Sequence, residues 1–168
     1  MDWQEKLRRL VQFYETLRAD GRSTEPFWVW TVKPPVPFEW PVLLPPAPTL
    51  RRFYELCGGG EFGPMIRFVP AGKLHAVTVS WIDTLRDYDE RGDILIPGRH
   101  IVFANDADGT PWILDTTTGE VASFYWKGGD WEEPRFGSHD EFMEHIFAPE
   151  LDDAHWASAL GIILSRQS

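Results

Sequence analysis

Apolar residues recur at helical spacing in the first part of the chain. Asp2 and Glu5 open this pattern in the arrangement of a capping box, and Gly21 follows its last apolar position. We therefore predict an amphipathic helix between Asp2 and Gly21 whose apolar face packs on the core of the domain. That face consists of Trp3, Leu7, Leu10, Tyr14 and Leu17.

The next pattern is a proline-rich segment, with seven prolines between positions 34 and 48. Proline fixes φ and has no backbone N–H, so this segment should be extended. The apolar residues between the prolines favour a connection packed on the core; the alternative is a ligand for another domain. A second helix is expected from Pro48 to the glycines that begin at Gly58.

Gly58, Gly60 and Gly63 match the spacing of a dinucleotide-binding loop. Such a loop follows a strand and precedes a helix, whereas here the helix comes first and the strand-like residues 65–69 come second. We therefore expect no cofactor site. Residues 75–79 alternate and predict another strand, and Ser80 then predicts a helix that ends near Gly92.

From His100 onwards the chain has short apolar runs, "HIVFA", "PWILD" and "EVASFYW", separated by "NDADGT" and "TTTG". Asn, Asp and Gly tolerate the backbone conformations of tight turns. We predict a three-stranded antiparallel meander over 100–126, with Gly109 and Gly119 in its turns. The fold class is then α+β, a single domain over 1–168 with a twisted, mainly antiparallel sheet flanked by helices.

The acidic string after the first of these strands invites a calcium interpretation, which spacing argues against. If Asp106 is the first position of an EF-hand loop, the required glycine falls on Pro111 and the bidentate glutamate on Thr117. We expect no metal site here. A catalytic carboxylate pair among Asp106, Asp108 and Asp115 remains an alternative to simple turn chemistry.

Two further helices are expected near the end of the chain. Ser138 and Glu141 form a capping box for residues 139–147, with Asp140 and Glu144 pointing away from the apolar face. The last helix is expected over 152–165, after an Asp cap.

Charge is distributed unevenly along the chain. Residues 1–100 carry equal numbers of basic and acidic side chains, so the net charge of −10 lies entirely in residues 101–168. This acidic excess disfavours nucleic acid as a ligand and favours a basic protein partner; an acidic surface that only aids solubility is the alternative. The single cysteine, Cys57, and a charged N-terminus without long apolar runs indicate a cytoplasmic protein with no membrane span.

The candidate interaction site combines an aromatic side chain with carboxylates. Trp often dominates binding energy, and charges steer association, so we expect these residues to contact the partner. Alternatively, Trp131 only covers the edge of the sheet. The candidate residues are Asp130, Trp131, Glu132 and Glu133 in one loop, with Asp140 and Glu144 on the following helix.

The sequence contains no G-x-S-x-G, H-E-x-x-H or C-x-x-C string, so we expect no catalytic site, although an unrecognised enzyme is an alternative. Cys57 lies on an apolar helix face and should be a core residue. His139 and His145 are six positions apart, about 120° around a helix, which does not suit one metal ion. We expect solvent-facing or capping roles for the histidines.

Three stretches together resemble the SUKH superfamily. They are Leu44-Pro45 leading into the helix "LRRFYELCGGG", the hairpin "VFANDADGTPWILDTTTGEV", and the helix "SHDEFMEHI". The resemblance covers residues 44–147; the proline-rich connection and the last helix depart from the family pattern. The superfamily includes a yeast cell-wall synthesis regulator and many bacterial immunity proteins.

The resemblance implies a binding fold and not an enzyme class. Many bacterial members neutralise a toxin, often a nuclease, by binding it. The expected function is therefore neutralisation of a toxin by stoichiometric binding, and a regulatory or scaffold module of the same fold is the alternative. Binding surfaces vary among members, so the resemblance assigns no site residue.

Overall fold

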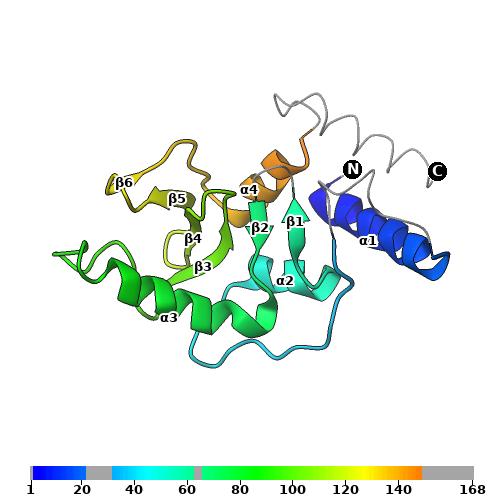
Figure 1. The fold of residues 1–168 in the computed structure, drawn as a ribbon, viewed down its shortest axis with the longest axis horizontal. Helices are drawn as coiled ribbons and strands as arrows, with labels where there is room; N and C mark the ends of the chain where they lie inside the picture. The colour runs from blue at the N-terminus through cyan, green and yellow to red at the C-terminus, as the bar shows by residue number, and fades with distance from the viewer. Residues whose placement is uncertain (1, 22–31, 63–65, 149–168) are drawn as a thin grey trace.

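The computed structural model describes residues 2–21, 32–62 and 66–148. Within these residues the fold is α+β, with helices around an antiparallel sheet (Figure 1). The helices are α1 (Trp3–Ala19), α2 (Pro48–Leu56), the short 3-10 helix η2 (Ala71–Lys73), α3 (Leu74–Leu85) and α4 (His139–Ile146). The strands are β1 (Gly60–Phe62), β2 (Ile66–Phe68), β3 (His100–Asn105), β4 (Pro111–Asp115), β5 (Val121–Tyr125) and β6 (Asp130–Trp131).

The described strands form one open sheet in chain order, from β1 at one edge to β6 at the other. Every neighbouring pair is antiparallel. The predicted meander over 100–126 is confirmed as β3, β4 and β5. Gly109 and Gly119 have φ values of 86° and 83°, so glycine supplies the left-handed conformation that each turn requires.

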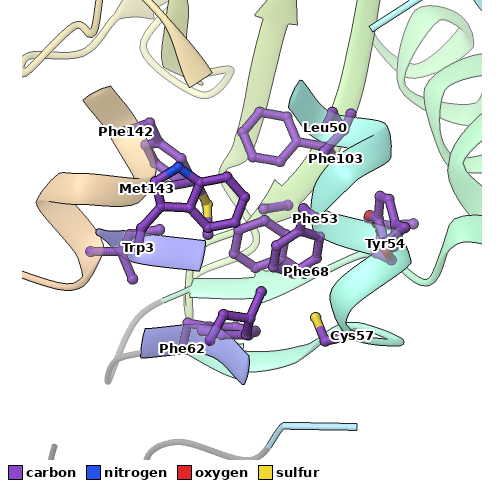
Figure 2. Packing of buried hydrophobic residues seen from close by; sticks show 14 of the residues in the cluster. Trp3, Leu50, Phe53, Tyr54, Cys57, Phe62, Phe68, Phe103, Phe142 and Met143 are labelled. Carbon is purple, nitrogen blue, oxygen red and sulfur yellow. Dashed lines mark hydrogen bonds between the residues drawn. The ribbon is translucent and has the colours of Figure 1, made fainter. Parts of the chain in front are cut away.

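Helices α1, α2 and α4 cover one face of the sheet. Figure 2 shows Trp3 from α1, Phe53 from α2 and Phe142 from α4 gathered around Phe103 of β3. The predicted apolar stripe of α1 is therefore confirmed as part of the core shared with the sheet. A single domain with one shared core should unfold cooperatively, so we predict one thermal transition.

Helix α3 covers the opposite face. Leu85 of α3 belongs to a second apolar cluster with Val102, Ile113 and Phe124 from the three central strands. Neighbouring strand residues point to opposite faces, so Val102 faces α3 while Ile101 and Phe103 face the first cluster. The sheet thus has an apolar layer on each side.

The strand predicted over 75–79 is wrong, because these residues lie inside α3. Five residues are too few to distinguish the two-residue period of a strand from the 3.6-residue period of a helix. In the structure, helical spacing places Leu74, Thr78 and Leu85 on the buried side. Ser80 is accordingly within the helix and does not begin it. The helix also ends at Leu85, before the expected Gly92.

The glycines after α2 allow the chain to pack closely on the proline-rich segment. Gly58 N donates to Lys33 O at 2.9 Å, and Lys33 N donates to Gly59 O at 3.0 Å. A Cβ atom at Gly58 would lie 2.5 Å from Pro34 O, which no larger residue tolerates. Gly58 is therefore needed for the close approach of the chain after α2 to Lys33 and Pro34.

Helix α4 begins as predicted. Ser138 Oγ accepts a hydrogen bond from Glu141 N at 3.1 Å, and the Glu141 carboxylate accepts one from Gly137 N at 2.8 Å. The apolar side of the helix is buried against the first cluster. The helix predicted over 152–165 lies outside the described residues.

Candidate interaction surface

The candidate loop is a hairpin at the edge of the sheet. Strand β6 pairs with β5, placing Trp131 opposite Phe124 and Asp130 opposite Tyr125. Glu132 N then donates to Ser123 O at 2.9 Å, which extends the pairing beyond the strand. Backbone pairing with β5 therefore holds Asp130, Trp131 and Glu132 in place, and Glu133 follows directly after them.

Trp131 is only partly available to a partner. Its ring packs edge-on against Phe124, with centroids 5.2 Å apart, and it borders the second apolar cluster. The guanidinium carbon of Arg135 lies 5.9 Å from the ring centroid. Trp131 thus covers the sheet edge and still presents part of its ring, so the two interpretations of this residue are compatible.

The carboxylates around Trp131 differ in their freedom. Glu132 accepts a hydrogen bond from Ser123 Oγ at 3.2 Å, which fixes its side chain against β5. Glu133 is 79% exposed and approaches Arg135 at 3.5 Å. Asp130 is exposed at the start of β6. Glu133 and Asp130 are the carboxylates best placed to meet a basic partner.

Asp140 and Glu144 belong to a different surface. Trp3 Nε1 donates to Asp140 Oδ1 at 2.8 Å, and Trp3 N donates to Glu144 Oε1 at 3.0 Å. Both carboxylates are exposed, but they bind α1 to α4 on the sheet face opposite α3. Because Trp131 packs on the α3 face, the six candidate residues do not form one patch.

A second tryptophan, Trp126, lies next to the candidate loop and packs against aromatic side chains that include an exposed tyrosine. Trp126, directly after β5, contacts Trp81 of α3 and Tyr88 beyond its end, with centroids 6.5 Å and 6.3 Å apart. Tyr88 is 61% exposed, while Trp81 and Trp126 are partly buried. Figure 1 shows the end of α3 and the β5–β6 hairpin at the same end of the molecule. We call Trp81, Tyr88 and Trp126 the aromatic cluster.

Acidic residues lie on both segments that contribute to the aromatic cluster. Residues 81–94 contain five acidic side chains against Arg86 and Arg91, and residues 130–133 add three more. Basic residues elsewhere in residues 1–100 balance the charge of the first group, so the net charge of that part of the chain is zero. A cation approaching this end of the molecule therefore meets a net negative surface.

The acidic turn between β3 and β4 also lies near this surface. Trp112 Nε1 donates to Asp106 Oδ1 at 2.6 Å, and Thr110 N donates to Asp108 Oδ1 at 2.9 Å. Burial is the main cause that raises the pKa of Asp106 to about 6, and the charges on Asp108 and Glu132 contribute to this rise. The turn residues thus make local hydrogen bonds and bring their negative charge close to Glu132.

A partly exposed ion pair lies at the other end of the meander. Arg99 donates to both carboxylate oxygens of Asp115 at 3.0 Å and 2.7 Å, and these hydrogen bonds hold the pKa of Asp115 well below its usual range. His100 Nδ1 accepts a hydrogen bond from Ile96 N at 2.8 Å, and burial lowers the pKa of this imidazole. Asp115 is thereby committed to structure and lies apart from Asp106, so the two do not form a catalytic pair.

Cys57 and His139 are both enclosed in the first cluster. Burial raises the pKa of the Cys57 thiol to about 12, which keeps it protonated and unreactive. His139 is buried, and its ring lies edge-on to Trp3 and Phe103, so the expected solvent-facing or capping role is wrong for this residue. A cavity of about 140 Å³ lies between the first turns of α2 and α4. The His139 ring nitrogens are buried and have no partner among the described residues.

Comparison of the chain with protein-family models, curated proteins and solved structures finds no match. None of the helices in the described ranges is both long enough and apolar enough to cross a bilayer.

Proposed function

We propose that this protein is a non-catalytic binding domain that neutralises a basic toxin by forming a stoichiometric complex with it. The observation that carries the proposal is the aromatic cluster, partly exposed at one end of the molecule between two acidic segments. Partly buried aromatic side chains surrounded by charge are typical of binding hot spots. The acidic flanks favour a basic partner and speed its association.

The side chains that could act in catalysis are paired or buried within the protein, which favours binding over catalysis. Asp115 is paired with Arg99, and the Cys57 thiol is enclosed in the core. The resemblance to SUKH proteins, among which toxin neutralisation is common, agrees with this direction. Cytoplasmic localisation would also suit an antidote that meets an incoming toxin.

A regulatory or scaffold module of the SUKH type is the second candidate. Its support is the same surface, because an acidic aromatic patch also suits a basic cellular protein. The neighbouring gene discriminates between the two candidates: an immunity protein is expected beside a gene for a large secreted protein that ends in a toxin domain.

The direct test uses the toxin domain encoded by that neighbour. Co-expression of this protein should restore growth of cells that produce the domain, and calorimetry on the purified pair should give a one-to-one complex. A Trp131→Ala variant should bind more weakly by on the order of 2 kcal/mol. The proposal is wrong if the domain remains toxic while this protein is folded and abundant.

A further inference from the structure

Trp126 already carries a cation on its ring in the free protein. Lys127 Nζ lies 5.6 Å from the centroid of the Trp126 ring. This is within about 6 Å, the range over which a cation is attracted to an aromatic face. Hydrogen bonds from Thr110 chiefly lower the pKa of Asp108, and the charge on Lys127 lowers it a little further. The ammonium therefore lies at the Trp126 ring and also attracts the Asp108 carboxylate of the β3–β4 turn.

Residues outside the turn that carries Lys127 hold the Trp126 ring and the nearby carboxylate in place. Trp81 and Tyr88 pack edge-on against Trp126, which restrains the plane of its indole ring. Asp108 comes from the β3–β4 turn, and its carboxylate is held by a hydrogen bond from Thr110 N. The ring and this carboxylate are thus pre-positioned for a cation, whichever residue provides it.

Lys127 is a weakly held occupant of this position. Its side chain is exposed, and its turn continues through Gly128 and Gly129. An ammonium is strongly hydrated, and cation–π contacts at exposed sites contribute little. A guanidinium is more weakly hydrated and stacks on aromatic faces, so arginine should compete successfully with Lys127.

We propose that Trp126 is the anchor for an arginine side chain of a protein partner, which displaces Lys127 from the indole ring. The acidic side chains on residues 81–94 and 130–133 supply the charge complementarity that selects a basic partner. The inference rests on the proposed function for the identity of the occupant as a protein. The cation position itself rests on the contacts of Trp126 and Lys127.

The first test measures binding of a hexa-arginine peptide by calorimetry at low ionic strength, with hexa-lysine as the comparison. The native protein should bind hexa-arginine more tightly, because the two peptides carry equal charge but a guanidinium is more weakly hydrated and stacks on aromatic faces. Trp126→Leu keeps an apolar side chain but removes the aromatic face, and should weaken hexa-arginine binding about three- to thirty-fold. Trp126→Phe should be intermediate and preserves an aromatic ring if the leucine variant folds poorly.

The second test asks whether Lys127 competes for the same ring. Lys127→Met should tighten hexa-arginine binding about two- to five-fold. Arg67→Met is the matched control, since it makes the same change in net charge at the β1–β2 edge, where Arg67 pairs with Glu61 at 2.7 Å. In the Trp126→Leu background, Lys127→Met should lose most of its effect, because the shared ring is absent.

Three results would overturn the inference: no binding of hexa-arginine by the native protein, unchanged binding by folded Trp126→Leu, or equal effects of Lys127→Met and Arg67→Met. The toxin experiment tests the proposed function separately from the arginine site. If the peptide binds at Trp126 but no toxin is neutralised, the proposed function is wrong and the arginine site stands. If a toxin is neutralised equally well by Trp126→Leu, the function stands and the arginine site is wrong.

Discussion

His139 is the residue whose burial has the clearest consequence for stability. Its imidazole is enclosed by Trp3, Phe103 and Phe142, and burial lowers its pKa to about 3. In the unfolded chain the pKa of histidine is about 6.5. The unfolded state therefore gains a proton as the pH falls below about 6.5, while the folded state does not until about 3. The stabilising contribution is complete above pH 6.5 and declines as the pH falls towards 3.

Replacing His139 by Phe should remove this dependence. At pH 5 the native protein should have lost about 2 kcal/mol of its free energy of unfolding through this residue, and His139→Phe should not show that loss. Urea unfolding at pH 7.5 and pH 5 measures the difference. His145→Gln, which removes an exposed histidine from the same helix, is the control variant. An unchanged pH dependence in His139→Phe would contradict the assignment.

At the scale of elements, Trp3 fastens the first helix to the last described one. Asp140 and Glu144 accept hydrogen bonds from its side chain and backbone, across 137 and 141 positions of sequence. Trp3→Phe retains a buried ring but removes the indole donor, and should lower the free energy of unfolding by about 1 kcal/mol. Asp140→Ala should cost a similar amount for the same reason.

A double-mutant cycle tests whether Trp3→Phe and Asp140→Ala lower the free energy of unfolding by removing the same hydrogen bond. The double variant should be destabilised by less than the sum of the single variants, with a coupling of about 0.5 kcal/mol or more. Additive losses in urea unfolding would mean that the hydrogen bond contributes nothing. Asp140→Ala should also leave partner binding unchanged, since Asp140 lies on the face opposite the aromatic cluster.

The elements that the sequence predicts well are those whose local signals agree. The capping box of α4 and the glycines between β3, β4 and β5 specify their own boundaries. Helix α3 is different, because its β-branched Val77, Thr78 and Val79 favour strand locally, while packing on β3 favours helix. Tertiary contacts decide such a segment, so a local pattern does not predict it.

The candidate site was less predictable for a related reason. Trp131 and its carboxylates are adjacent in sequence, so a short stretch suggests them. Trp126 meets Trp81 and Tyr88 only because α3 and the β5–β6 hairpin end at the same place, and no sequence pattern gives that register. Similarly, Asp140 and Glu144 share a helix face, but only the position of α1 shows that both accept hydrogen bonds from Trp3.

At the scale of the whole molecule, charge should control the rate of association more than the strength of the complex. The β5–β6 hairpin lies at one end of the long axis and α1 at the other (Figure 1). Reversing Glu132 and Glu133 to Lys should slow association with a basic toxin domain. Added salt should reduce the difference from the native protein, because screening acts over about 10 Å at 0.1 M.

The matched control makes the same change in net charge at the far end of the molecule. Glu15→Lys with Asp20→Lys alters two exposed carboxylates on and just after α1. If the acidic surface steers the partner, this control should associate at nearly the native rate while the hairpin variant is slow. Stopped-flow association at two salt concentrations compares them. Equal slowing in both variants would mean that net charge alone attracts the partner. The native rate in both would place the encounter on another surface, and the acidic residues near Trp131 would then serve solubility.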